Sequence, residues 1–277
     1  MTDERNPLLP SIDVAQNGIG PASSKSRFDR WWLMVALVIG LILYLVYTQP
    51  DPYRRVIIFV QDGIRVTLSV TLTSFFFVLW LGLISGLGRL SKNPILSGIA
   101  SVYVEIVRGI PLLVQLLFWY FALPSIIQQI GATYNIQSMK DYLANPIWMA
   151  IFGLTFCYGA YMSEIYRAGI QSIPKGQMEA ARSLGMTHFQ AMRYVVIPQA
   201  IRVILPPVGN EFISMLKDSS LVSVVAVADM TRRGREFMAA NFIPIQTWVM
   251  IALLYLVLTL FSARVVTWIE KRTRIER

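Results

Sequence analysis

The sequence predicts an all-α protein that spans a membrane about six times. Of its 277 residues, 55% are hydrophobic and only 15% are charged, and the mean hydropathy of +0.53 exceeds that of soluble domains. A hydrocarbon core of about 30 Å requires roughly 20 apolar residues per helical span, and each span must satisfy its own backbone hydrogen bonds. Six apolar stretches meet this requirement: 31–47, 64–87, 95–123, 147–168, 194–216 and 248–268.

The first apolar stretch, 31–47, is expected to remain in the protein as a membrane helix. Basic residues precede it, as in a signal peptide, but the stretch is long for a signal-peptide core and Thr48 begins no small-residue cleavage site. Residues 1–30 are rich in Pro, Ser, Gly and Asn, so they are predicted to form a disordered cytoplasmic tail. Residues 269–277 are predicted to form a basic cytoplasmic tail at the other end of the chain.

The distribution of Lys and Arg predicts that both termini are cytoplasmic. Short cytoplasmic loops of membrane proteins carry an excess of these residues. With the N-terminus inside, the inner segments contain more Lys and Arg than the outer ones, although the run Arg232-Arg233-Gly234-Arg235 falls outside and argues against this arrangement. The net charge of +9 follows from this bias, so it is not interpreted as nucleic-acid binding.

Residues 174–193, between the fourth and fifth apolar stretches, contain the signals of two short helices. Pro174 suits the first turn of a helix, and Gly185 suits its end because glycine readily adopts the left-handed conformation. Thr187 is suited to cap a second helix, and Gln190 three residues later completes a capping box. The pattern predicts a helix pair in a loop that has nothing to bury in lipid.

Four residues of this loop are candidates for contact with another protein: Glu179, Ala180, Ala181 and Gly185. The three small residues would let a partner approach to backbone distance. The Glu179 carboxylate would offer a charge to a hydrogen-bond donor on that partner. Taken alone, the spacing is explained equally well by a tight interfacial hairpin without a partner.

The spacing of Glu179-Ala180-Ala181, Gly185 and Val195-x-Ile197-Pro198 resembles the EAA loop of bacterial ABC importer membrane subunits. That family has Ile and Leu where this chain has Val195 and Ile197, which are conservative departures. In the family this loop contains the coupling helix, which inserts into a groove of the ATPase subunit. The resemblance therefore favours a docking role for the loop.

Other stretches resemble the permeases of the polar amino-acid uptake branch of that family: 107–115, 158–170, 198–202 and 217–221. The branch usually has Thr where this chain has Ile110 and Ser219. The resemblance implies a five-helix permease core at 62–268, one additional N-terminal helix, and a cytoplasmic coupling loop at 174–193. It also implies a multi-pass protein of the bacterial inner membrane.

The same resemblance implies a transport subunit rather than an enzyme, moving polar amino acids by alternating access. ATP and Mg²⁺ would be bound by a partner ATPase dimer, because this chain has no G-x-x-x-x-G-K-[ST] loop, and no cofactor is expected in the chain itself. The other expected partners are a second permease subunit, identical or paralogous, a solute-binding protein, the amino-acid substrate and the lipid membrane. The alternative is a secondary transporter or channel without an ATPase partner.

Charged residues within the third apolar stretch mark a candidate substrate path. A charge at membrane depth costs about 2.5–3.5 kcal/mol on insertion scales, so it usually faces a cavity or another charge. Glu105 and Arg108 are three residues apart on one helix face, and one explanation is an ion pair between them. The other is that the break at Gly109-Ile110-Pro111 leaves backbone groups beside Arg108 that suit a substrate carboxylate, with Gln115 adding a hydrogen bond.

Two polar pairs near the outer end of the fifth apolar stretch are expected to line a gate or cavity: Asn210-Glu211 and Lys217-Asp218. Simple exposure at the membrane interface is the alternative. Metal and thiol chemistry is not supported, because the chain has a single histidine, His188, and a single cysteine, Cys157.

Overall fold

The computed structural model describes residues 30–273, and every element in this range is helical. The prediction of an all-α chain is confirmed for these residues. The predicted tail 1–30 lies outside them except for Arg30, where the first helix begins. Of the predicted basic tail 269–277, residues 269–273 are helical and continue the last helix, and residues 274–277 lie outside the described range.

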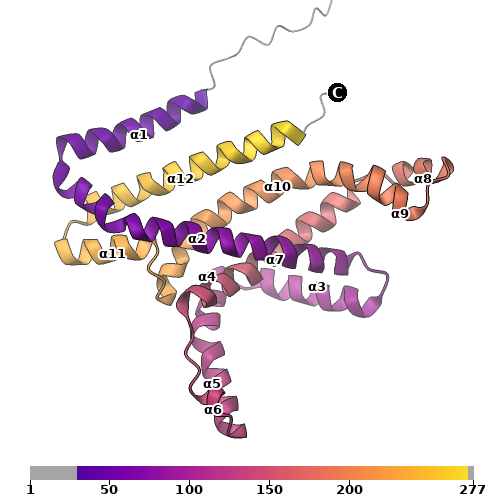
Figure 1. The fold of residues 1–277 in the computed structure, drawn as a ribbon, viewed down its shortest axis with the longest axis horizontal. Coiled ribbons are helices and arrows are strands. Elements are labelled where there is room, and N and C mark those ends of the chain that lie inside the picture. Colours follow the sequence, from indigo (N-terminus) through magenta and orange to yellow (C-terminus); the bar gives the residue numbers. More distant parts are fainter. Residues whose placement is uncertain (1–29, 274–277) are drawn as a thin grey trace, which may run out of the picture.

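Six long helices form an elongated bundle (Figure 1): α1 (Arg30–Thr48), α2 (Pro50–Arg89), α3 (Pro94–Gly109), α7 (Pro146–Gln171), α10 (Ile197–Asp218) and α12 (Pro244–Thr273). The shorter elements are α4 (Leu112–Leu117), a π-helical turn (Phe118–Ala122), α5 (Leu123–Tyr134), α6 (Gln137–Lys140), α8 (Lys175–Ser183), α9 (His188–Ala191), a second π-helical turn (Met192–Val196), a 3-10 segment (Ser219–Val225) and α11 (Met230–Asn241). Proline opens α2, α3, α7 and α12, at a position where its missing N–H would have no helical partner.

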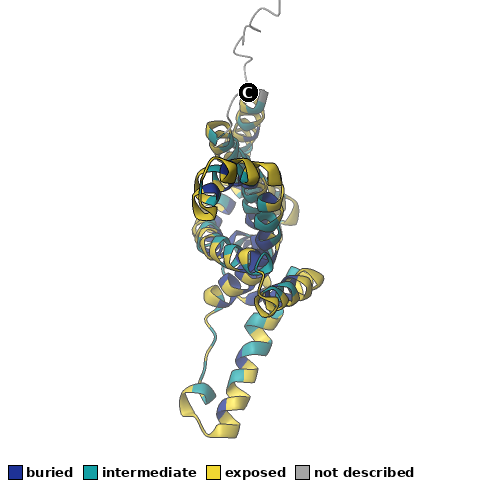
Figure 2. Cartoon of the chain, turned by 90° about the vertical axis from the view of Figure 1, so that its right-hand side faces the viewer, coloured by how far each residue is buried: buried dark blue, intermediate teal, exposed yellow. Residues whose placement is uncertain are grey.

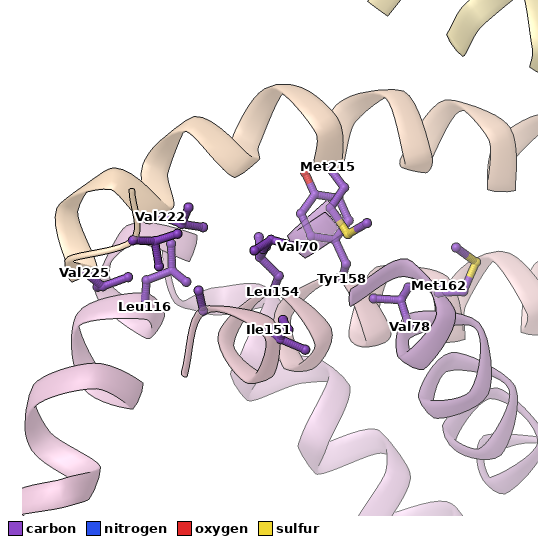
Figure 3. Packing of buried hydrophobic residues seen from close by; sticks show 12 residues of the cluster. Val70, Val78, Leu116, Ile151, Leu154, Tyr158, Met162, Met215, Val222 and Val225 are labelled. Atoms are coloured by element: carbon purple, nitrogen blue, oxygen red, sulfur yellow. The ribbon is translucent and has the colours of Figure 1, made fainter. Parts of the chain in front are cut away.

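The centre of the bundle is the contact between α2 and α7. A Cβ built at Gly82 of α2 would lie 2.5 Å from the Met162 side chain, and one at Gly86 would lie 2.9 Å from the Ser163 carbonyl oxygen. Small residues of this kind allow membrane helices to approach closely. Around this contact, Val70, Val78, Leu154, Tyr158 and other side chains form the main buried cluster, which α10 and α4 complete with Met215 and Leu116 (Figure 3).

The apolar stretch 95–123 is divided between two helices, and the predicted break at Gly109-Ile110-Pro111 is confirmed. α3 ends at Gly109, Ile110 is extended (φ −107°, ψ 130°), and a new helix begins after Pro111. The reason is local, since proline donates no backbone hydrogen bond and its ring drives the preceding residue out of the helical region. From this point α4 turns aside and α5 leads away from the bundle, with most of its residues exposed or half-buried (Figures 1 and 2).

Four helical segments of the described range have the length and hydropathy to cross a membrane: Trp31–Thr48, Pro50–Arg89, Leu112–Tyr134 and Pro244–Thr273. α7 and α10 are also long, with 26 and 22 residues, but carry polar and charged side chains that lower their hydropathy. A membrane protein with several helical spans therefore fits the structure. The count of about six spans stays a prediction.

The start of α1, the end of α12 and the helices α8 and α9 lie toward the same end of the bundle (Figure 1). This arrangement agrees with the prediction that both ends of the chain lie on the same side of the membrane as the loop 174–193. That this side is the cytoplasm stays a prediction.

The arginine run of α11 lies near the opposite end, and two of its charges are paired (Figure 1). Arg233 donates to Asp62 of α2 (3.0 Å) and to Glu236 (2.9 Å), and Arg232 also donates to Glu236 (3.0 Å). Burial opposes the ionised form of Glu236, but the hydrogen bonds from Arg233 and Arg232 outweigh it and lower its pKa. Because two of the arginines are paired with carboxylates, the run argues less strongly against an orientation that places it outside the cell.

Candidate functional site: a polar cavity and an exposed loop

A polar cavity of about 410 Å³ lies at the break between α3 and α4. Residues 108–112 form one wall, and Tyr158 and Tyr161 of α7 form another. Cys157 of α7 and the two carboxylates of α10, Glu211 and Asp218, complete the lining. Charged groups from α3 and α10 thus meet tyrosines of α7 and the irregular backbone between α3 and α4, and polar groups at membrane depth are tolerated in such a setting.

Gln115 holds the break together. Its side-chain Nε2 donates to the carbonyl oxygens of Val107 (2.8 Å), at the end of α3, and of the extended residue Ile110 (2.9 Å). The side chain is buried and is not part of the cavity lining. Gln115 therefore supports the cavity wall, whereas the sequence had suggested a substrate contact.

Arg108 faces the cavity without a carboxylate partner in the described part of the chain. Its guanidinium lies over the ring of Tyr161, with 5.2 Å between the guanidinium carbon and the ring centroid. Glu105, one turn earlier, is exposed and does not line the cavity, and the ion pair suggested by the spacing is not formed among the described residues. The structure thus favours the second explanation of Arg108, in which its charge remains available.

The two cavity carboxylates come from α10 at positions seven residues apart, which places them on one helix face two turns apart. Asp218 accepts a hydrogen bond from the Tyr158 hydroxyl at 2.7 Å. Glu211 accepts no hydrogen bond within the described range, so its carboxylate is available as well. Asn210, the other candidate on this helix, is exposed and lies outside the lining.

Sequence reasoning did not propose three of the cavity side chains, Cys157, Tyr158 and Tyr161, as part of a site. The two tyrosines carry a readable signal, because residues three apart in a helical span share a face. Chemically, the cavity offers a guanidinium that is able to bind a carboxylate in two-pronged fashion, a carboxylate able to bind an ammonium group, and phenolic hydroxyls between them. No cluster of three metal-ligating side chains occurs in residues 30–273.

The exposed loop has the predicted local structure. Gly185 has a φ of +85° and ends α8, where its N–H donates to the Arg182 carbonyl (3.0 Å) and the next N–H donates to the Ala181 carbonyl (3.2 Å). Thr187 and Gln190 form the capping box at the start of α9, with bonds of 3.3 and 2.8 Å. Both predictions are confirmed.

The loop presents only part of the surface that the sequence suggested. Glu179, Ala180 and Gly185 are exposed, but Ala181 is only 4% exposed and packs within the loop. Neighbouring helical residues point about 100° apart, so Ala180 and Ala181 cannot both face a partner. Two apolar side chains that sequence reasoning missed lie on the surface instead, Leu184 at 82% and Phe189 at 70% exposure.

The end of α7 that leads into this loop is tied to α2 by an ionic cluster. Glu164 pairs with Arg89 of α2 and with Arg167, whose Nε lies 3.1 Å from a Glu164 oxygen. Glu164 and Arg167 are three residues apart on one face of α7, so the cluster joins neighbouring turns of α7 to α2.

The helical membrane fold, the polar cavity and the exposed helix pair together define a membrane transport subunit. The chain belongs to the family described as binding-protein-dependent transport system inner membrane component, the permeases of bacterial ABC importers, which matches residues 78–275.

Named relatives and solved structures agree with this assignment. The glutamine transport system permease GlnP of Escherichia coli (strain K12) is 35% identical over 214 residues, covering 77% of this chain and 92% of GlnP. The L-cystine transport system permease TcyB of Bacillus subtilis (strain 168) is 38% identical over 213 residues, covering 76% and 85%.

A crystal structure of an amino acid ABC transporter with histidines is similar at a TM-score of 0.69 and 38% identity, covering 83% of this chain and 98% of that one. An inward-facing MetNI methionine ABC transporter shares the fold at a TM-score of 0.62 and 20% identity, covering 78% and 96%.

Proposed function

We propose that this chain is the permease subunit of an ATP-driven importer of polar amino acids. The observation that carries the proposal is that Arg108 and Glu211 both line the cavity and form no ion pair with each other or with another described side chain. Every α-amino acid carries a carboxylate and an ammonium group, and these are the complements of a guanidinium and a carboxylate. The relatives named for glutamine and cystine transport support the same substrate class.

The exposed loop would couple this chain to the ATPase. Leu184 and Phe189 supply apolar side chains for a pocket on the partner, and Glu179 supplies a charge beside them. An ATPase dimer has two such pockets, so a second permease, identical or paralogous, would provide the other loop. A solute-binding protein would deliver the amino acid, and ATP with Mg²⁺ would be held by the ATPase while the permease pair alternates between outward and inward access.

Replacing Glu179 by alanine is expected to weaken the complex with the ATPase. The exposed carboxylate forms no ion pair in the described chain, so it is available for a charge-assisted hydrogen bond, worth about 1.5–3 kcal/mol. The difference in affinity between wild type and variant should be largest at low salt and shrink as salt screens the interaction. Affinity measured at several salt concentrations checks this. Equal affinities throughout would make Glu179 an ordinary solvated residue.

The proposed function is tested by expressing the chain with its candidate ATPase and reconstituting the purified complex in liposomes. ATP-dependent uptake is then measured with a panel of labelled polar amino acids, with ADP as the control. We expect the ATPase to co-purify with the permease and uptake to require ATP. Uptake by the permease alone, driven by an ion gradient, would establish the secondary transporter instead.

A further inference from the structure

An apolar groove between α2, α10 and α12 runs directly into a polar pocket at the loop end of the bundle. The groove has a volume of about 640 Å³ and is lined by side chains such as Leu72, Phe75, Leu205, Phe212 and Val265. The substrate cavity does not share these residues, since it uses a different face of α10. The groove is therefore a separate feature of the molecule.

The polar pocket, of about 920 Å³, lies where α10 and α12 meet the start of the exposed loop. Its lining includes Arg202 of α10 and Lys271 of α12, together with the hydroxyls of Thr267 and Thr273. Neither Arg202 nor Lys271 forms an ion pair in the described part of the chain. Two cationic side chains thus converge on a pocket at the end of the membrane helices.

The two cavities are continuous along both helices. Glu270 lines both of them. On α10 the pocket uses positions 199–206 and the groove 205–212; on α12 the groove uses positions 258–270 and the pocket 267–273. Along these helices an apolar groove is followed by a cationic pocket, and this order matches that of the acyl chain and the headgroup in a phospholipid.

We infer that this groove and pocket bind one phospholipid of net negative charge, such as phosphatidylglycerol. The acyl chain lies in the groove, the phosphate contacts Arg202 and Lys271, and Glu270 accepts hydrogen bonds from headgroup hydroxyls. The charged lining side chains sum to +1, because two are cationic and one is anionic. Basic pockets between membrane helices on the cytoplasmic side are suited to anionic headgroups.

The site extends to the exposed loop, so a bound lipid is expected to affect transport. Pro174 and Gln177, at the start of α8, line the pocket, and Gln177 accepts a hydrogen bond from Gln199 of α10 at 3.2 Å. A bound headgroup would stabilise the junction between α8, α10 and α12. Anionic lipid is therefore expected to increase coupling between the loop and its partner.

The test uses the complete purified complex, washed in detergent and supplied with phosphatidylglycerol or phosphatidylcholine. Lipid retained per permease is measured by native mass spectrometry. We expect one phosphatidylglycerol per permease, and the combined Arg202→Gln and Lys271→Gln variant should bind it roughly 10- to 30-fold more weakly. Arg272→Gln is the matched control, because Arg272 stacks on Trp268 and lines neither cavity.

A second variant changes no charge and tests the groove even if the combined variant of Arg202 and Lys271 does not fold. Val265→Trp fills the groove and should also displace the lipid, whereas Val249→Trp, at a similarly exposed position of α12 outside the groove, should not. Retention of phosphatidylglycerol by Val265→Trp, or equal retention of phosphatidylcholine, would overturn the inference. So would efficient cross-linking of Val265→Cys between two permeases, because the second permease would then occupy the groove.

Discussion

Replacing Arg108 by alanine is expected to abolish amino-acid uptake while leaving the complex assembled. The guanidinium is the cationic group of the cavity lining, and it has no carboxylate partner within residues 30–273. A lost two-pronged contact to the substrate carboxylate removes about 1.5–3 kcal/mol per charged hydrogen bond, enough for a loss of roughly 100-fold or more. Uptake into liposomes and the yield of the assembled complex are measured together.

Two further variants separate a substrate contact from a structural role. Arg108→Lys keeps the charge but loses the planar fork, so it should impair uptake less than alanine does. Glu105→Ala is the matched control, since Glu105 is exposed one turn away and outside the lining, and it should transport normally. If Arg108→Ala lowered the yield and Glu105→Ala restored it in the double variant, an ion pair between them would explain both residues.

The helical fold was predictable because it depends on local signals. Apolar length predicted most of the long helices, and the four residues from Thr187 to Gln190 were enough to predict the capping box correctly. The path of the chain after Gly109 was not predictable in the same way. Pro111 predicts a break in the helix. The direction that the chain takes after the break depends on the packing of α4 against α7 and on the hydrogen bonds of the Gln115 side chain.

The cavity was predicted only in part, and its members explain why. Arg108 and Glu211 stand out as charges in apolar stretches, and both line the cavity. Gln115 was predicted to contact the substrate. Its position in the sequence does not reveal that the carbonyl oxygens at the break need a hydrogen-bond donor, which is the role of its side chain in the structure. Tyr158 was overlooked because a tyrosine in an apolar helix is usually a packing residue, and its bond to Asp218 joins helices 60 residues apart.

Replacing Gly185 by valine is expected to uncouple the permease from its ATPase without preventing membrane insertion. Apart from the two neighbouring residues, a Cβ at this position would meet no atom of residues 30–273 within 4 Å, so the fold itself leaves space for it. The φ of +85°, however, is a conformation that a β-branched residue rarely adopts, and forcing it costs about 1–3 kcal/mol. The variant should be extracted in normal yield but show roughly tenfold lower substrate-stimulated ATP hydrolysis.

Matched variants show whether backbone conformation or close approach makes Gly185 necessary. Asparagine tolerates the left-handed region, so Gly185→Asn keeps the turn while placing a side chain on the exposed surface. Gly176→Ala is the control, because this glycine lies in α8 with open space around it and no positive φ. Normal ATP hydrolysis by Gly185→Asn would show that the left-handed turn is what matters. Low hydrolysis by both Gly185→Val and Gly185→Asn would show that any side chain here blocks contact with the partner's surface. Full uptake by Gly185→Val would show that the loop does not dock through this position.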